Sequence, residues 1–296
     1  MAGRRATGPP SREEAGLVAH STTAPEVRRR KRAGGATPLV MVTAYDEPSA
    51  RLCDAAGVDL LLVGDSVANT VLGYPDTLHV TIDDMARHTA AVARATPSAL
   101  IVGDLPWMSY HTGVDDAVRN AATLVRAGAG CVKLEGGVVR TPVVAGILGA
   151  EIPVMGHLGL TPQSVHAMGG YRVQGKDLED AKRLLEDAHA LEDAGCFALV
   201  LEGVPDVLAS RITAQLTIPT IGIGAGPSTD GQVLVFHDLL GLGNRPLAKF
   251  VREYAQLGAQ VTEAIGRFAD DVRSGAFPGP AETYGASDEL RAALGE

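Results

Sequence analysis

Short apolar runs alternate with longer amphipathic stretches along most of this chain, and that alternation constrains the fold more than any other feature. Eight of the runs have the length and composition of buried parallel strands. They cover residues 38–45, 60–65, 99–105, 131–135, 152–156, 197–202, 218–223 and, more weakly, 232–236. Because repeated strand–helix units build parallel sheets, eight of them predict an α/β fold of the closed (β/α)8 TIM-barrel type. A doubly wound open sheet is the alternative.

The stretches between the runs carry the signals of helices. Residues 82–95 and 177–194 repeat apolar side chains at helical spacing. Gly57, Gly128 and Gly195 each stand where one of these helices is expected to stop. The glycines support the strand–helix frame independently of the apolar spacing.

The two ends of the chain differ from this repeating body. Residues 1–22 indicate a disordered extension. After the last strand, residues 247–273 predict one long helix, Pro278-Gly279-Pro280 a break and residues 287–294 a short helical tail. No Pro- or Ser-rich linker interrupts the body, so we expect a single barrel domain with C-terminal helices over residues 23–296.

The charge, the apolar runs and the cysteines of the chain limit the classes of molecule that it is expected to bind. A formal net charge of -9 argues against a nucleic-acid backbone as the main partner, because such binding depends on clustered Lys and Arg. No apolar run approaches the roughly 18 residues that a membrane helix needs. Cys53, Cys131 and Cys196 are odd in number and widely spaced, which is typical of reduced thiols. We therefore expect a cytoplasmic protein with small-molecule partners.

Three of the predicted strands end at an acidic residue, namely Asp65, Asp104 and Glu135. The carboxyl ends of parallel strands meet at one edge of the sheet, where α/β folds form their active sites. Three carboxylates at one edge repel one another unless a cation or a shared proton neutralises them. Hard divalent ions favour such oxygen ligands, so Asp65, Asp104 and Glu135 predict a Mg²⁺ site.

Polar residues beside these acids are candidates for substrate binding. Ser66 can offer its hydroxyl and backbone N–H to a carboxylate, or it belongs to a simple Asp-Ser turn. Lys133 lies two residues before Glu135, so both point to one face with Lys133 deeper. Its ammonium needs an anion there, either a substrate carboxylate or an acid of the protein. His157 can hydrogen-bond a bound carbonyl, ligate a metal or be structural, and the three acids favour the hydrogen bond.

Glu202 ends the sixth run, and almost all of its neighbours in the sequence are apolar. Desolvation by the surrounding Leu and Val would raise the pKa of its carboxyl, which suits a general base near neutral pH. A loop cap or a pair with an arginine is the alternative. The glycine-rich residues 222–226 resemble a phosphate cradle but lack the usual spacing, and close backbone packing explains them equally well.

Several motifs spread in order over about residues 25–284 together resemble the ketopantoate hydroxymethyltransferase family. They are Val42-Thr43-Ala44-Tyr45-Asp46, Val63-Gly64-Asp65-Ser66, Val132-Lys133-Leu134-Glu135-Gly136-Gly137, Gly156-His157-Leu158-Gly159-Leu160-Thr161-Pro162-Gln163-Ser164, Gly170-Tyr171-Arg172-Val173-Gln174-Gly175, Gly222-Ile223-Gly224-Ala225-Gly226 and Asp230-Gly231-Gln232-Val233-Leu234-Val235. Such ordered agreement is highly specific. The resemblance implies a barrel of the phosphoenolpyruvate mutase/isocitrate lyase type and a homo-oligomer, a decamer of two pentameric rings.

The resemblance also implies a reaction. The family transfers the one-carbon unit of 5,10-methylenetetrahydrofolate to 3-methyl-2-oxobutanoate and forms 2-dehydropantoate for pantothenate synthesis, with Mg²⁺ as cofactor. By motif position, Asp65 and Asp104 match the Mg²⁺ ligands, and Glu135 matches an acid that reaches the metal directly or through water. Glu202 matches the proton acceptor. The residue after it is Gly203, where the family often has another small residue such as Cys.

The oxo acid has its own predicted binding residues. Ser66, Asp104 and Lys133 match the family's oxo-acid-binding groups by motif position. Together with the metal ligand Asp65 and the hydrogen-bonding His157, they complete the predicted substrate-binding set.

Two other functions fit parts of the sequence. A Mg²⁺-dependent lyase or mutase acting on a 2-oxo acid would share the barrel and the acids, and it would turn over without folate. Such enzymes often place an active Cys in a mobile loop, whereas the three cysteines here lie within predicted elements. A non-catalytic barrel that binds a metabolite would tolerate Asn or Gln in place of the acids, and it leaves their position at strand ends unexplained.

Overall fold

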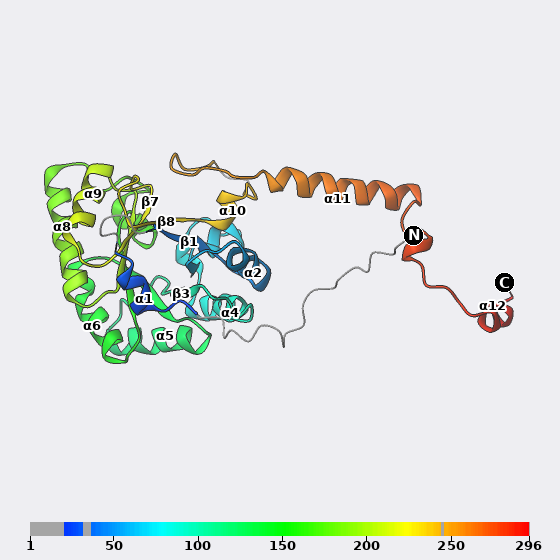
Figure 1. Ribbon diagram of the computed structural model, residues 1–296, viewed down its shortest axis with the longest axis horizontal. Helices are drawn as coiled ribbons and strands as arrows, with labels where there is room; N and C mark the ends of the chain where they lie inside the picture. Colours follow the sequence, from blue (N-terminus) through cyan, green and yellow to red (C-terminus); the bar gives the residue numbers. More distant parts are fainter. Residues whose placement is uncertain (1–20, 32–36, 244–245, 296) are drawn as a thin grey trace, which may run out of the picture. The chain divides into compact units, whose positions relative to one another are not determined.

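The computed structural model describes residues 21–31, 37–243 and 246–295 (Figure 1). The predicted extension over residues 1–22 therefore lies almost wholly outside the described residues. None of the helices in the described ranges is long and apolar enough to cross a membrane.

The chain divides into two compact units. The first runs to Phe236 and includes Ala248–Val251, and the second comprises His237–Leu247 and the residues from Arg252 onward. The first unit contains the whole barrel. A single domain over residues 23–296 stays a prediction.

Eight parallel strands form a closed barrel in which each strand pairs with the next and the last pairs with the first. They are β1 (Leu39–Thr43), β2 (Leu60–Val63), β3 (Leu100–Asp104), β4 (Cys131–Glu135), β5 (Val154–Gly159), β6 (Ala198–Glu202), β7 (Thr220–Ile223) and β8 (Gly231–Leu234). The predicted (β/α)8 barrel is confirmed, and the open sheet is excluded.

Helices connect consecutive strands around the barrel except between β7 and β8, which a loop joins (Figure 1). In the first unit they are α1 (Ala24–Arg29), α2 (Glu47–Ala55), α3 (Val67–Thr70), η1 (Thr77–His79), α4 (Ile82–Ala93), α5 (Val114–Arg126), η2 (Val138–Arg140), α6 (Thr141–Gly149), η3 (Pro162–Ser164), α7 (Val165–Met168), α8 (Leu178–Asp193) and α9 (Asp206–Gln215). Gly57, Gly128 and Gly195 follow α2, α5 and α8 with φ angles of 78°, 112° and 103°. The predicted helix stops are therefore confirmed, because glycine adopts positive φ without steric cost.

Helix α4 shows how the sequence sets a local boundary. The Thr81 hydroxyl accepts a hydrogen bond from the Asp84 backbone N–H, and the Asp84 carboxylate accepts one from the Thr81 N–H. This reciprocal cap contributes about 1 kcal/mol. Met85, Thr89 and Val92 then recur on one face and are buried. The cap starts the helix, and burial of that face holds it on the barrel.

The barrel interior changes from apolar to polar along the strands. Helix α1 closes the amino-terminal end with the fully buried Val27, which belongs to the same core cluster as the inward strand residues. On β3 the inward series continues from Val102 to Asp104, and on β5 from Met155 to His157. Because side chains alternate along a strand, the last inward layer presents polar groups at the carboxyl ends.

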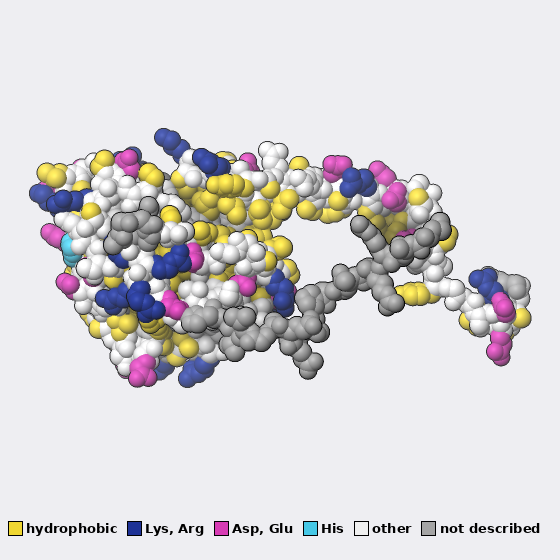
Figure 2. Space-filling view, in the orientation of Figure 1, with side chains coloured by type: hydrophobic (Ala, Val, Ile, Leu, Met, Phe, Trp, Pro, Cys, Tyr) yellow, Lys and Arg dark blue, Asp and Glu magenta, His cyan; other side chains and the backbone are white. Residues whose placement is uncertain are grey.

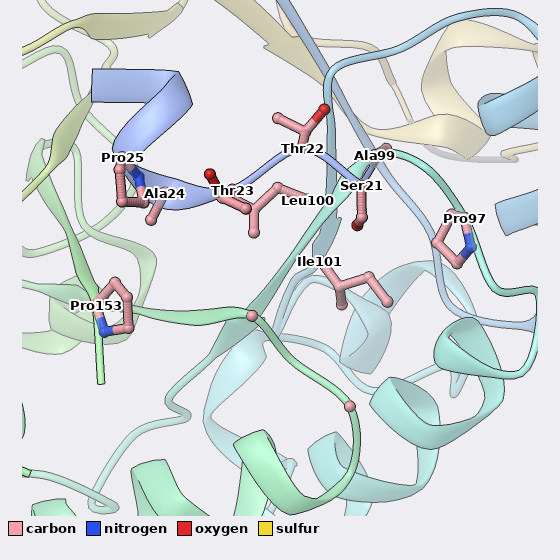
Figure 3. A pocket seen from close by; sticks show the side chains of 12 residues that line it. Ser21, Thr22, Thr23, Ala24, Pro25, Pro97, Ala99, Leu100, Ile101 and Pro153 are labelled. Atoms are coloured by element: carbon pink, nitrogen blue, oxygen red, sulfur yellow. The ribbon is translucent and has the colours of Figure 1, made fainter. Parts of the chain in front are cut away.

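A cavity of about 340 Å³ lies at the opposite, amino-terminal end of the barrel (Figure 3). It lies between residues 21–25 at the start of α1, the first residues of β3 and the loops that carry Pro97 and Pro153. Its walls among the described residues are small or apolar and include no charged side chain. The cavity is therefore separate from the acids at the carboxyl ends of the strands.

The second unit contains α10 (Phe236–Leu239) from its second residue on, α11 (Leu257–Ser274), η4 (Pro280–Glu282) and α12 (Asp288–Leu294). The helix predicted over residues 247–273 begins only at Leu257, so its first part is wrong. Phe250 instead packs in the first unit against Gly224, where an added Cβ would lie 2.6 Å from the ring. That tertiary contact holds the segment in a non-helical course.

Helix α11 has no buried residue. Val261, Ile265, Phe268 and Val272 recur at helical spacing and are about half exposed. Figure 2 shows these hydrophobic side chains gathered along the helix.

Candidate active site

Four acids and one histidine gather at the carboxyl rim of the barrel. Asp65 lies two residues after the end of β2. Asp104, Glu135 and Glu202 end β3, β4 and β6, and His157 lies within β5. All but Glu202 are at most 5% exposed. Because all strands run in parallel, residues far apart in the sequence meet at one end. The structure thus brings the predicted metal ligands and the predicted base to the same rim.

Asp65 and Asp104 are in direct proximity. The Asp65 backbone N–H donates to Oδ2 of Asp104 at 3.2 Å. Burial, and then repulsion by Asp104 and Glu135, raises the pKa of Asp65 well above its usual value. Burial also raises the pKa of Asp104, although the neighbouring Lys133 opposes the shift. The cluster holds more negative charge than its protein neighbours neutralise.

Lys133 lies inside the barrel, as predicted from its spacing to Glu135. Its Nζ lies 2.8 Å from Oδ1 of Asp104 and 3.3 Å from Nδ1 of His157. Burial lowers the pKa of Lys133, but Asp104, Glu135 and Asp65 outweigh this effect and raise it overall. Without a substrate, the anion that compensates this buried lysine is therefore an acid of the protein.

His157 lies between two carboxylates. Its Nδ1 is 3.4 Å from Oε1 of Glu135, and its Nε2 is 3.3 Å from Oε2 of Glu202. Burial and Lys133 lower the pKa of His157, but the two carboxylates raise it overall to about 9. Burial likewise raises the pKa of Glu135, but the nearby, positively charged His157 reverses this shift, so that the pKa of Glu135 lies below its usual value. His157 thus keeps its second proton at neutral pH.

Glu202 has a polar neighbour in space that its apolar neighbours in the sequence do not indicate. Its side chain is 17% exposed, and His157 lies beside it. The expectation of a carboxylate without polar neighbours is therefore wrong. The reason is the register between β5 and β6, which pairs Gly159 with Glu202 and brings a polar side chain from the adjacent strand.

Ser66 sits at the start of α3 without capping it through its side chain. Its hydroxyl instead forms a 2.8 Å hydrogen bond with the hydroxyl of Tyr45. The Ser66 side chain therefore does not cap the turn, as the alternative interpretation expected. The hydroxyl lies one residue from Asp65 at the same rim.

The donor set fits a hard divalent cation. Oε1 of Glu135 is buried and receives no hydrogen bond, although it lies beside His157. Across the described part of the chain, no group of three or more His, Cys, Asp or Glu side chains is arranged so that it could hold a metal ion by itself. Mg²⁺ usually takes only one or two carboxylates and completes its shell with water and substrate oxygens, which agrees with an open cluster of acids.

Sequence reasoning missed Gln163 and Tyr110, which are both buried beside the acids. Gln163 donates from its side chain to Asp65 and from its backbone to Glu135. Neither residue type titrates near neutral pH, so a search for acids, bases and ligands passes over them. The available signal was the position of Gln163 in the loop after the fifth strand, in the same motif as His157.

The glycines of residues 222–226 are explained by close packing. An added Cβ on Gly222 would lie 2.7 Å from the Thr229 hydroxyl, and one on Gly226 would lie 2.6 Å from Cβ of Asp206. These distances are shorter than ordinary contacts between atoms. The packing alternative is therefore sufficient without a phosphate.

A family model described as ketopantoate hydroxymethyltransferase matches residues 21–280 of the chain. The chain belongs to this family. The 3-methyl-2-oxobutanoate hydroxymethyltransferase of Methylobacterium sp. (strain 4-46) is 56% identical over 256 residues, which are 86% of this chain and 89% of the relative. The enzyme of the same name from Koribacter versatilis (strain Ellin345) is 53% identical over 258 residues, 87% of this chain and 88% of the relative. The family resemblance inferred from the motifs is confirmed.

Solved structures confirm the type of barrel. Phosphonopyruvate hydrolase superposes with a TM-score of 0.58 at 14% identity, covering 93% of this chain and 95% of that chain. A 2,3-dimethylmalate lyase, described as a PEP mutase/isocitrate lyase superfamily member, gives a TM-score of 0.57 at 19% identity, covering 92% and 94%. At such identities the likeness shows the fold alone.

Proposed function

We propose that this protein transfers the hydroxymethyl group from 5,10-methylenetetrahydrofolate to 3-methyl-2-oxobutanoate and forms 2-dehydropantoate for pantothenate synthesis. The observation that carries the proposal is one rim that holds a buried acid cluster with Lys133 and a separate carboxylate, Glu202, beside His157. The names of the relatives support the oxo acid as acceptor. The folate donor and the Mg²⁺ ion rest on the family resemblance.

Asp65, Asp104 and Glu135 would hold the Mg²⁺ ion. Burial and mutual repulsion raise the pKa values of Asp65 and Asp104, so a divalent cation would relieve a real excess of negative charge. When bound, Mg²⁺ would supply Lewis-acid stabilisation to the oxygen on which charge develops.

The oxo acid would bind through groups that already point into the rim. Lys133 would attract the substrate carboxylate, with Asp104 as its partner when no substrate is bound. The Ser66 hydroxyl, now bonded to Tyr45, would donate to the same carboxylate. His157 retains its proton at neutral pH, since its pKa is raised to about 9, and would donate a hydrogen bond to the 2-oxo oxygen.

Glu202 would act as the general base. Its carboxylate would accept the proton from C3 of the oxo acid, and the electron pair of that C–H bond would form the enolate. C3 would then bond to the methylene carbon of the opened folate iminium. Water would supply the hydroxyl oxygen as the carbon–nitrogen bond to folate breaks, and the reactive carbon itself comes from the cofactor.

The proposal is tested first by product formation. The protein is incubated with 3-methyl-2-oxobutanoate and 5,10-methylenetetrahydrofolate, with and without Mg²⁺, and 2-dehydropantoate is measured. We expect product only when all three are present. Absence of product at saturating concentrations would reject the proposed function.

The role of Glu202 has a narrower test. Glu202→Gln should slow exchange of the C3 proton into D₂O by about 10²–10⁴-fold, the usual contribution of a general base. Proton NMR of the oxo acid measures the exchange, and calorimetry checks that oxo-acid binding is retained. Glu179→Gln, at a side chain that is 82% exposed on α8, is the matched control and should exchange like wild type. Exchange at the wild-type rate in Glu202→Gln would reject this assignment.

The lyase or mutase alternative makes a different prediction about cysteine. Burial raises the pKa of Cys53 to about 11 and that of Cys196 to about 12, and it also raises the pKa of Cys131. None of the three is suited to donate a proton or attack a substrate near neutral pH. Consumption of the oxo acid without folate would favour this alternative.

The assembly and location follow the family as well. We propose a cytoplasmic homo-oligomer, a decamer of two pentameric rings. Light scattering of the full chain in solution measures its mass, and a monomer at micromolar concentration would contradict this proposal.

A further inference from the structure

Gln163 connects two of the rim acids from one position in the chain. It lies in η3, in the loop after β5, and is 5% exposed. Its side-chain Nε2 donates to Oδ2 of Asp65 at 2.9 Å and to the backbone carbonyl of Leu105 at 3.0 Å. Its backbone N–H donates to Oε2 of Glu135 at 3.0 Å. Acids that follow β2 and end β4 therefore share one donor residue.

Tyr110 determines which way the Gln163 amide faces. The Tyr110 hydroxyl accepts from the Glu135 backbone N–H at 3.2 Å and donates to Oε1 of Gln163 at 2.6 Å. A reversed amide would place Oε1 against the Asp65 carboxylate and the Leu105 carbonyl, which are both acceptors. Each polar atom of the Gln163 side chain thus has a partner that suits only one orientation.

We propose that Gln163 is a positioning residue that holds Asp65 and Glu135 ready for a divalent cation, with Tyr110 as its support. The role rests on the proposed function of the rim. Asp65 and Glu135 repel each other in a buried site, and they would turn apart or take up protons without fixed donors. Gln163 engages one oxygen of each carboxylate, and Oε1 of Glu135 remains buried without a hydrogen bond.

The chemistry of an amide suits this role better than that of other side chains of similar size. A neutral donor orients a carboxylate without cancelling its charge, so the affinity for a cation is retained. Glutamate would bring a further acid against Asp65 and lose both donated bonds. Methionine would fill the space but leave Asp65 and the Leu105 carbonyl without donors.

The test measures Mg²⁺ binding rather than activity alone. Gln163→Met is titrated with Mg²⁺ by calorimetry at a fixed concentration of 3-methyl-2-oxobutanoate, and circular dichroism checks the fold. We expect the Mg²⁺ dissociation constant to rise about 10–100-fold, the usual effect of losing a group that orients a ligand. Turnover should recover partly as Mg²⁺ is raised, which a purely structural defect would not show. Gln260→Met, at an exposed position on α11, is the matched control.

Tyr110→Phe provides a second variant. It leaves the Gln163 side chain in place and removes the donor to Oε1 together with the acceptor of the Glu135 backbone N–H. We therefore expect a smaller rise in the Mg²⁺ dissociation constant, of about 3–10-fold. A folded Gln163→Met with wild-type Mg²⁺ affinity overturns the proposal. If Gln163→Met does not fold, Tyr110→Phe decides, and unchanged affinity there overturns it. Failure of the wild type to form 2-dehydropantoate would reject the proposed function, whereas the Mg²⁺ titrations would still judge the positioning role.

Discussion

Two lysine–aspartate pairs lie at opposite ends of the same barrel, and they differ in how well the aspartate is satisfied. At the amino-terminal end, Oδ2 of Asp230 accepts from Lys31 Nζ at 2.9 Å and from the backbone and hydroxyl of Thr220 at 2.8 and 3.1 Å. At the carboxyl end, Asp104 meets Lys133 at 2.8 Å but also faces two other buried acids.

The difference indicates that the pair at the amino-terminal end stabilises the fold, whereas the acids at the carboxyl end are arranged to bind another group. Three donors converge on Asp230, so its burial costs little and ties β8 to β7. At the other end, Lys133 and His157 face the buried carboxylates of Asp65, Asp104 and Glu135, and the pKa of Asp104 is raised as a result of burial and of the neighbouring Glu135. An excess of buried negative charge is typical of a site that binds a cation or substrate, whereas residues that only stabilise the fold are usually neutralised by their neighbours.

The largest effect is expected from Asp104→Asn. Loss of a proposed Mg²⁺ ligand should lower 2-dehydropantoate formation on the order of 10³-fold, because a metal contributes several kcal/mol to transition-state stabilisation. Stability should stay within about 1 kcal/mol of wild type, since removing one of the repelling acids offsets the lost ion pair. Turnover and urea unfolding of the metal-free protein measure both quantities. A large loss of stability would show that the Asp104 pair stabilises the fold as the Asp230 pair does, and it would contradict the comparison.

The opposite pattern is expected from Asp230→Asn. Breaking a buried pair by changing one partner should lower the free energy of unfolding by about 3 kcal/mol. Urea unfolding measures this loss, and the turnover of the folded fraction should match wild type, because Asp230 precedes β8 at the end remote from the acids. A selective loss of turnover without a loss of stability would break the comparison.

The smallest effect concerns pH. The pKa values of Asp65, Asp104 and His157 are all raised in the native protein, so the folded state binds more protons than the unfolded chain. Its stability must then fall as pH rises, and the part due to His157 is present below about 6.5 and lost up to about 9. Between pH 6 and 9 we expect the metal-free protein to lose about 1–3 kcal/mol.

Urea unfolding in EDTA at several pH values measures this slope. His157→Asn should flatten the curve, whereas His189→Asn, at a side chain that is 45% exposed on α8, should leave the slope as in wild type. A curve that rises with pH would contradict the expected direction.

Much of the barrel could be predicted from local pattern. All eight strands lie within or next to the predicted runs, because a strand buried on both faces reads as a continuous apolar segment. Boundaries were less predictable. The fifth run was expected to end at residue 156, but β5 continues to Gly159 and includes His157, since this part is buried although it is less apolar.

The site was predicted as a set of acids but not as a network. The acids stood out because each terminates an apolar run. Gln163 and Tyr110 did not, since amide and phenol groups are common in loops and their partners lie far away in the sequence. For Glu202, the sequence showed its apolar neighbours on β6 but not the histidine that β5 brings beside it.

The sequence by itself determined the repeating strand–helix frame, the rim on which the acids lie and the family, because these follow from periodicity and from motifs read in order. Only the tertiary structure decided which side chains touch. Closure of the barrel sets the register between strands, and that register pairs Asp104 with Lys133 and Glu135 with His157. Hydrogen bonds and charge interactions act over a few ångströms in space, so the distance between residues along the chain does not predict them.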